Sequence, residues 1–320
     1  MVAERDITSL SLERMKVSVV RDLLPFGSRP GQTPEMGGKP PLMHPLLRLL
    51  LICIPSLALY VGLQIAIHAI TKPVDDSLKP IVLVLAFMLA SFLLLIAYRR
   101  AILKLERRNA GELPIRPTAG AAWGLLIGLG LFATVQFVVI ASGASAITGF
   151  AGFHYLLPSL AASFFAAVGE EIIFRGGLYR ILDEWVGPTI ALTVSAALFG
   201  IIHLGNPGAT ATGAVAIALE AGVLLGLAYE ATGSLWLPIG IHLGWNFCEG
   251  GVFGSAVSAT ESNGIFVVQS HGSDLWTGGT FGLEASLPAV VICLLASVVF
   301  VVLLRNRPQG SVPSGTGRAP

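Results

Sequence analysis

Long apolar stretches, separated by short polar segments, follow one another along most of the chain. Several of them approach or exceed the roughly 20 residues that an α-helix needs to cross the hydrocarbon core of a bilayer. This pattern predicts about eight transmembrane helices, at residues 46–70, 79–98, 120–142, 155–174, 188–204, 209–230, 235–254 and 286–304. We therefore expect an all-α fold, a polytopic membrane protein built as a bundle of these helices.

Composition agrees with a membrane protein and narrows the possible partners. Of the 320 residues, 54% are hydrophobic and 12% are charged, about half the charged share of a typical soluble domain. The net charge of +1 gives no basic field that would attract nucleic acid, so the lipid bilayer is the expected partner. The three cysteines are far apart and form no CxxC motif, which argues against a disulfide framework or a zinc–cysteine site.

Polar segments divide the chain into regions of different character. We expect a flexible polar N-terminal tail (1–44), N-terminal transmembrane helices (45–150), a second group of helices (151–254), an extracytoplasmic loop (255–285), a last transmembrane helix (286–304) and a flexible C-terminal tail (305–320).

The distribution of basic residues predicts the orientation in the membrane. The densest basic run follows the second apolar segment and contains Arg99, Arg100, Lys104, Arg107, Arg108 and Arg116. This run is expected in the cytoplasm, whereas residues 255–285 contain acidic residues but no Lys or Arg and are expected outside. With eight helices, both termini are then cytoplasmic, and we expect a multi-pass protein of the cell membrane.

Three apolar segments contain polar residues that membrane helices rarely carry, because a charge near the bilayer centre costs a few kcal/mol. Each has a pair of residues four positions apart: Glu171 and Arg175 in "GEEIIFR", Phe199 and His203 in "FGIIH", and His242 and Asn246 in "HLGWN". Residues at this spacing share one face of a helix. Each pair is therefore expected to project from one side of its helix.

Glu170 and Glu171 are adjacent, but successive helical residues are rotated by about 100° and face different directions. Glu171 can form an intrahelical ion pair with Arg175, which leaves Glu170 without a cation of its own. A carboxylate held in an apolar cavity in this way suits a general base. An ion-pair cluster that only holds helices together is the alternative.

The depth of two of these residues in the membrane favours chemistry. If the helices of segments 155–174 and 188–204 turn back near Trp185, Glu170 lies 15 residues before that turn and His203 lies 18 residues after it. An antiparallel hairpin would therefore place both at similar depth. A glutamate and a histidine that face one cavity can hold and deprotonate a water molecule.

Further polar residues complete the parts of an amide hydrolase without a covalent nucleophile. His242 and Asn246 can donate hydrogen bonds to a developing oxyanion. A zinc ion bound by His203, His242 and Glu170 is the competing interpretation. The chain lacks the HExxH spacing of many zinc peptidases, so we expect no metal and no other cofactor.

The three motifs, in this order and on separate apolar segments, resemble those of the CPBP family of intramembrane proteases. That family contains the type II CAAX prenyl endopeptidases and bacterial Abi proteins. Its EExxxR, FxxxH and HxxxN motifs match "EEIIFR" at 170–175, "FGIIH" at 199–203 and "HLGWN" at 242–246. The resemblance covers about residues 155 to 250 and implies an all-helical core with an intramembrane catalytic cavity, at residues 151–254.

The resemblance also implies catalytic roles. Glu170 would be the base that activates water, assisted by His203, in a glutamate-dependent peptidase. His242 and Asn246 would form the oxyanion site. The substrate would be a membrane-associated protein or peptide, hydrolysed at an internal peptide bond.

Glu171, Arg175 and Phe199 are implied as supporting residues of the same site. Two other classes of function stay open. A proton-coupled transporter could use the buried Glu, Arg and His residues as a relay, although no inverted repeat is visible in the sequence. A family member without catalytic activity could act as a scaffold or immunity factor.

Residues outside the motifs provide two further expectations. Glu220 lies midway along an apolar segment, so it is a candidate for lining the cavity or binding substrate, or else a paired structural acid; Glu249 is assigned no role. Glycines at four-residue spacing predict faces where helix backbones approach closely. They are Gly120, Gly124 and Gly128 in one segment, and Gly222 and Gly226 in another.

Overall fold

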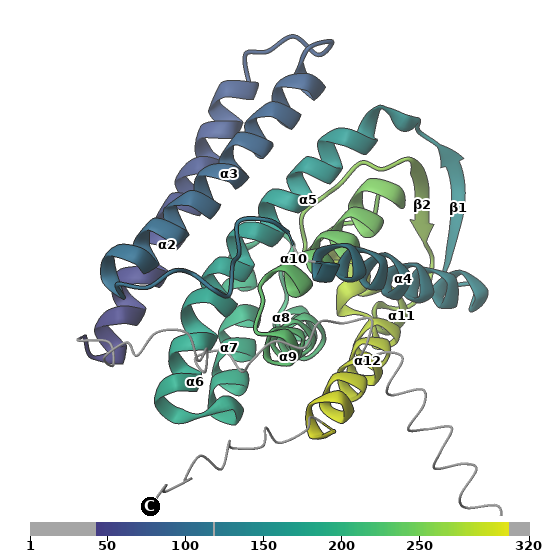
Figure 1. The fold of residues 1–320 in the computed structure, drawn as a ribbon. Coiled ribbons are helices and arrows are strands. Elements are labelled where there is room, and N and C mark those ends of the chain that lie inside the picture. The colour runs from purple at the N-terminus through teal and green to yellow at the C-terminus, as the bar shows by residue number, and fades with distance from the viewer. Residues whose placement is uncertain (1–42, 118, 307–320) are drawn as a thin grey trace, which may run out of the picture.

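The computed structural model of the chain describes residues 43–117 and 119–306, and it is predominantly helical (Figure 1). Each of the eight apolar segments forms a helix, which confirms the all-α, polytopic fold class. The tails predicted at 1–44 and 305–320 lie almost entirely outside the described residues.

Seven helices among the described residues are long and apolar enough to cross a membrane. Four of them are single elements: α2 (Pro45–Thr71), α3 (Lys79–Leu105), α4 (Ala119–Ala141) and α12 (Leu287–Arg305). The other three combine shorter elements. The first consists of η1 (Phe153–Tyr155), α5 (Leu156–Glu171), the π-helical η2 (Ile172–Tyr179) and α6 (Arg180–Val186), and the second of α7 (Pro188–Ile202) and η3 (His203–Gly205). The third consists of α8 (Ala211–Ile217), the π-helical η4 (Ala218–Gly222) and α9 (Val223–Thr232).

The remaining predicted segment, 235–254, forms a shorter helix in the middle of the bundle. It consists of the 11-residue α10 (Trp236–Asn246), which continues as the 6-residue π-helical η5 (Phe247–Val252). Nearly every side chain of α10 is buried. A helix that is apolar on all sides is buried within a larger protein or spans a membrane, and here protein surrounds it.

Glycines bring α4 and α10 into backbone contact. A Cβ atom added to Gly124 or Gly128 of α4 would overlap backbone atoms of α10, including the carbonyl oxygens of Leu237 and Ile241. Gly240 of α10 meets the backbone of α4 in the same way. The predicted close approach along the glycine face is confirmed, and it fixes the position of the helix that carries His242 and Asn246.

A small antiparallel sheet was not predicted from the sequence. Strand β1 (Ser145–Phe150) follows α4 and pairs with β2 (Phe266–Ser270) from the long loop at 255–285. The loop also contains three short helical turns: α11 (Asp274–Thr277), η6 (Gly279–Phe281) and η7 (Leu283–Ala285). The two strands are short and lie more than a hundred residues apart, so neither gives a local signal of its pairing.

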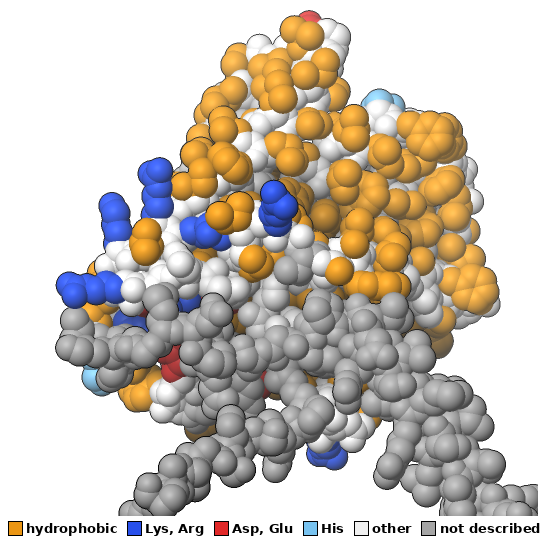
Figure 2. All heavy atoms as spheres, in the orientation of Figure 1, with side chains coloured by type: hydrophobic (Ala, Val, Ile, Leu, Met, Phe, Trp, Pro, Cys, Tyr) orange, Lys and Arg blue, Asp and Glu red, His pale blue; other side chains and the backbone are white. Residues whose placement is uncertain are grey.

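Apolar side chains cover much of the outer surface. Figure 2 shows hydrophobic side chains over the α2–α3 hairpin and over the side that contains α4, β1 and β2, while Lys and Arg gather near the lower end of the hairpin. Ile65 of α2, Leu89 of α3 and Leu295 of α12 are at least 60% exposed. An exposed apolar surface of this extent fits contact with lipid.

Buried ion pairs join the ends of α2, α3 and α6. Arg48 of α2 binds Glu106, which follows α3, at 2.6 Å, and Glu184 of α6 at 2.6 Å. Arg180 binds Glu106 at 2.9 Å. Burial by itself raises the pKa of the Glu106 carboxyl, but Arg180, with Arg108 and Arg48, outweighs burial and lowers that pKa to about 2.

Candidate active site

The first motif lies where α5 passes into the π-helical η2. Glu170 and Glu171 are the last two residues of α5, and Arg175 is in η2. Arg175 Nη1 donates to Glu171 Oε1 at 2.8 Å, with both side chains fully buried, which confirms the predicted ion pair. Arg175 Nη2 also donates to the carbonyl oxygens of Ala221 and Gly222, at 3.1 and 3.2 Å, so the same guanidinium ties η2 to η4.

Glu171 also orients an imidazole of the third motif. The Nδ1 atom of His242 lies 3.1 Å from Glu171 Oε1. A carboxylate only accepts hydrogen bonds, so Nδ1 carries a proton and donates it to this contact. Arg175, Glu171 and His242 thus form one buried chain of charge-assisted hydrogen bonds, which fixes the ring and leaves its Nε2 atom facing Glu170.

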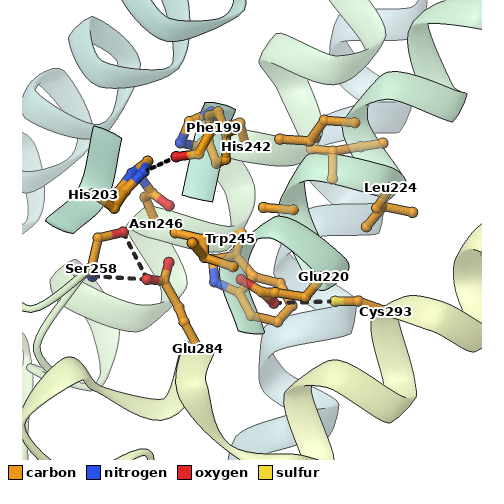
Figure 3. A pocket seen from close by; sticks show the side chains of 14 residues that line it. Phe199, His203, Glu220, Leu224, His242, Trp245, Asn246, Ser258, Glu284 and Cys293 are labelled. Carbon is orange, nitrogen blue, oxygen red and sulfur yellow. Dashed lines mark hydrogen bonds between the residues drawn. The ribbon is translucent and has the colours of Figure 1, made fainter. Parts of the chain in front are cut away.

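His203, from the second motif, is oriented by its own helix. It caps the C-terminal end of α7, and its Nδ1 atom lies 2.6 Å from the carbonyl oxygen of Phe199 (Figure 3). Since a carbonyl oxygen only accepts, the Nδ1 atom is the protonated one. The Nε2 atom of His203 therefore faces Glu170 with a free lone pair when the ring is neutral.

Glu170 is the residue on which both imidazoles converge. Its Oε2 atom lies 3.8 Å from His203 Nε2 and 3.9 Å from His242 Nε2. These distances exceed a direct hydrogen bond and suit one water molecule bound between the groups. The expected hairpin is confirmed: α6 and α7 are joined at Gly187, two residues beyond Trp185, and the hairpin brings Glu170 and His203 together.

Tyr60 is a site residue that the sequence did not reveal. It lies in α2, and its hydroxyl donates to Glu170 Oε1 at 3.3 Å. A Cβ atom added to Gly169 would overlap the Tyr60 ring, so the ring packs closely against the backbone just before Glu170. Tyr60 is outside all three motifs and within an apolar run, so no local pattern marks it.

Asn246 lies in the same pocket as both histidines. The pocket is lined by residues of α7, η3, α8, η4, α9, α10, α12 and the 255–285 loop. His203, His242 and Asn246 line it together, as Figure 3 shows, and all three side chains are largely buried. Glu170 is not among the lining residues; it contacts the imidazoles instead.

Phe199 packs between the charged and imidazole groups of the site. Its ring centroid is 4.7 Å from the Arg175 guanidinium carbon and 4.7 Å from the centre of the His203 ring. The ring of Phe174 stands edge-on against it at 5.0 Å. A cation over an aromatic face is attracted to it, so Phe199 separates Arg175 from His203 while holding both.

The described residues do not group as a metal site. No three His, Cys, Asp or Glu side chains within residues 43–117 and 119–306 are placed to hold a metal ion. The set considered from the sequence, His203, His242 and Glu170, has its nearest N–O separations at 3.8 and 3.9 Å.

Two acidic residues outside the motifs are buried near the site. Glu220 lies in η4 and lines the pocket, in line with the first of its two expected roles. Glu249, to which the sequence assigned no role, lies in η5 and is fully buried. Their positions follow from the tertiary packing of η4 and η5 and are not visible in any sequence motif.

Comparison with known proteins identifies one family. Residues 152–248 match the family model described as type II CAAX prenyl endopeptidase Rce1-like. The comparison with curated proteins and that with solved structures each give no match. The matched segment contains all three motifs and ends two residues after Asn246. Residues 152–248 of the chain are thus similar to the type II CAAX prenyl endopeptidase Rce1-like family, and this match confirms the resemblance to the CPBP proteases.

Proposed function

We propose that this protein is an intramembrane endopeptidase in which Glu170 and His203 activate a water molecule. The observation that carries the proposal is the convergence of two imidazole Nε2 atoms on Glu170 Oε2, at 3.8 and 3.9 Å, inside a helical membrane bundle. The family match supports a protease of the CAAX type. The assignment of individual roles is our own.

In this mechanism Glu170 is the general base. Its carboxylate takes one proton from a water held between it and His203 Nε2, while the water oxygen attacks the carbonyl carbon of the peptide bond. The C–N bond breaks as the stored proton passes to the amide nitrogen, giving a carboxylic acid and an amine. Tyr60 donates to the other carboxylate oxygen, 3.3 Å away, and so holds Glu170 in position.

His242 and Asn246 form the proposed oxyanion site. The Asn246 side-chain amide can donate directly to the oxyanion. His242 uses Nδ1 toward Glu171, so its Nε2 atom becomes a donor only when the ring is an imidazolium. The carboxylates of Glu170 and Glu171, on either side of the ring, stabilise that positive charge.

Arg175, Glu171 and Phe199 are proposed to hold this arrangement. Arg175 binds the oxygen of Glu171 that also binds His242. Loss of this carboxylate would therefore leave a buried guanidinium without its partner and the His242 ring free to rotate. We infer that these residues act through the histidines and do not touch the substrate.

The proposed substrate is a peptide segment of a membrane-associated protein, reached from the cytoplasmic side. The basic run after α3 lies at the same end of the bundle as Glu184 of α6, because Arg48 and Arg180 bind both Glu106 and Glu184. Basic segments favour the cytoplasmic side. We propose, as the basic residues of the sequence predict, that both termini lie in the cytoplasm and that the β1–β2 end lies outside.

Capture of substrates by an inactive variant tests the proposal. Glu170→Ala protein, purified from its host membranes, should retain peptides that the wild type cleaves, and mass spectrometry would identify them. Wild-type protein prepared in parallel should yield their cleavage products. Recovery of the same intact peptides from both proteins would contradict the proposal.

Two further comparisons separate the other interpretations. A catalytically inactive scaffold or immunity factor should keep its cellular effect after Glu170→Ala, whereas a protease should lose it. A zinc-dependent peptidase should lose cleavage after exhaustive chelation and regain it with zinc. A glutamate peptidase should cleave equally well before and after chelation.

A further inference from the structure

The pocket beside the catalytic side chains extends to carboxylates that the mechanism does not use. Glu220 of η4 and Glu284 of η7 line it together with His203, His242 and Asn246. In Figure 3 these two carboxylates lie on the side of the pocket away from Phe199 and His242. Substrate bound at the proposed oxyanion site would therefore have both carboxylates nearby.

Glu220 is deeply buried and only weakly hydrogen bonded. The residue is 1% exposed, and its Oε1 atom has no hydrogen-bond partner among the described residues. Its Oε2 atom accepts from the Cys293 thiol at 3.5 Å, which is a weak donor. Buried polar atoms in proteins are nearly always satisfied, so an unpaired carboxylate oxygen that lines a pocket points to a ligand.

The neighbouring acids have no cationic partner among the described residues. Glu284 Oε2 accepts from the backbone nitrogen and the hydroxyl of Ser258, at 2.8 and 2.7 Å. Glu249, fully buried, interacts electrostatically with Glu284 and Glu220. Within residues 43–117 and 119–306 no Lys or Arg forms an ion pair with any of the three, and none lines the pocket.

Most of the rest of the pocket wall is apolar. Its other main lining residues are Ile217, Ala221, Leu224, Leu225, Ile241 and Trp245. An apolar wall that ends at carboxylates matches a side chain with a carbon stem and a cationic head, as in Lys and Arg. A bare metal ion fits less well, because these side chains do not form a metal-binding group.

We propose that this pocket is a substrate subsite for a Lys or Arg side chain next to the cleaved peptide bond, with Glu220 and Glu284 accepting its cationic head. The proposal rests on the proposed function, because the subsite is defined by its place beside His203, His242 and Asn246. Two measurements test it, and only one of them needs catalysis.

The first measurement compares cleavage of apolar peptides that differ only by Lys or Met at each position in turn. The wild type should show a higher kcat/KM for Lys at one position flanking the cleaved bond. Glu220→Gln should lower the Lys-to-Met ratio of kcat/KM about 30-fold or more, the usual cost of removing one partner of a buried charge pair. Glu261→Gln, an exposed acid of the 255–285 loop, is the matched control and should keep the ratio.

Equal kcat/KM for the Lys and Met peptides, or an unchanged ratio in Glu220→Gln, would overturn the subsite while leaving the proposed protease in place. If the wild type cleaves no peptide, the proposed function fails, and the second measurement decides on the subsite. The two proposals can therefore fail separately.

The second measurement is binding to the full chain in detergent, followed by thermal unfolding. N-acetyl-lysine methylamide should raise the Tm of the wild type in a saturable way, whereas N-acetyl-norleucine methylamide and matched NaCl should not. The rise should be absent in Glu220→Gln and in Glu220→Met, and retained in Glu261→Gln. No rise in the wild type, the same rise with norleucine or NaCl, or a rise that persists without Glu220 would each overturn the proposal.

Discussion

Glu170 and Glu171 are adjacent in the chain but have different partners. Glu171 is fully buried between Arg175 and His242, each within hydrogen-bonding distance of its Oε1 atom. Glu170 meets a tyrosine hydroxyl and two imidazole Nε2 atoms that no other described carboxylate contacts. One turn of helix thus supplies both a carboxylate that orients a histidine and a carboxylate that can accept a proton from water.

Tyr60 provides a test of how Glu170 is held. Tyr60→Phe removes only the hydroxyl that donates to Glu170 Oε1. A hydrogen bond to a charged group contributes about 1.5–3 kcal/mol, so we expect kcat to fall roughly 10- to 100-fold. KM should stay unchanged, because Tyr60 does not line the substrate pocket.

Tyr98→Phe is the matched control for Tyr60→Phe. Its hydroxyl is hydrogen bonded to Glu112 and to the carbonyl oxygen of Gly176, and to none of the proposed catalytic residues. This variant should lower the Tm and leave kcat close to the wild-type value. A Tyr60→Phe enzyme with normal kcat, or one that loses only stability as Tyr98→Phe does, would show that Tyr60 is merely a packing residue.

At the scale of single residues, helical spacing predicted part of the site. The i, i+4 rule correctly paired Glu171 with Arg175, and the hairpin geometry correctly brought Glu170 to His203. The link from Glu171 to His242 and the contact with Tyr60 both join segments far apart in the chain. No periodic pattern encodes contacts of that kind, so they appear only in the folded structure.

At the scale of secondary-structure elements, π-helical turns adjoin the functional residues. The segment η2 begins directly after Glu171, η5 begins directly after Asn246, and η4 contains Glu220. A π-helical turn inserts an extra residue and shifts the side chains that follow it, and such turns are frequent at functional sites. Hydrophobic periodicity located these helices correctly but cannot reveal a one-residue change of winding within them.

The contact between α4 and α10 also determines the geometry of the site, because α10 carries two of the proposed catalytic residues. Gly128→Ala places a Cβ atom against the backbone of Ile241 and Trp245. The clash should lower the free energy of unfolding by about 1–3 kcal/mol. It should also reduce the cleavage rate, since Ile241 precedes His242. Thermal unfolding in detergent and peptide hydrolysis measure the two effects.

Gly130→Ala provides the internal comparison on the same helix. No atom lies within 4 Å of a Cβ atom added at this position. Alanine favours helix over glycine by up to about 1 kcal/mol, so this variant should be as stable as the wild type or more so, with unchanged activity. Equal losses in Gly128→Ala and Gly130→Ala would contradict the proposed role of the α4–α10 contact.

At the scale of the whole molecule, a charged network at one end of the bundle ties α2 and α3 to the catalytic core. Arg48 and Arg180 approach Glu106 from different helices, and the Glu106 side chain is fully buried. Because α2 carries Tyr60, this network also helps to keep Tyr60 beside Glu170. The sequence predicted the basic run at this end, but not that buried acids would join three helices there.

This network should make stability dependent on acid pH. The pKa of Glu106 in the folded protein, about 2, lies below its ordinary value of 4.5. The ionised Glu106 therefore contributes fully to the free energy of unfolding above about pH 4.5, and this contribution is lost as the pH falls toward 2. The shift corresponds to a loss on the order of 3 kcal/mol. Unfolding free energy measured between pH 6 and pH 2 would show this decline. Glu106→Gln should be less stable than the wild type at pH 6 and should lose less unfolding free energy between pH 6 and pH 2. The same loss in both proteins would exclude Glu106 as the source of the pH dependence.

The proposed orientation can be tested with single added cysteines. Asn109→Cys, in the basic run, should react with a membrane-impermeant thiol reagent only after the cytoplasmic face is exposed. Asn263→Cys, in the 255–285 loop, should react in intact cells. Both positions are exposed, and the wild type measures the background from its own cysteines. The opposite pattern would reverse the topology and the proposed side of substrate entry.

The most direct test of the central claim is hydrolysis of one captured peptide by purified protein in lipid nanodiscs. The wild type should cleave it, and Glu170→Gln, which keeps the shape of the side chain, should lower the rate at least about 100-fold, the usual minimum contribution of a general base. The Tm of this variant should stay close to that of the wild type. Cleavage by folded Glu170→Gln protein at the wild-type rate would contradict the account.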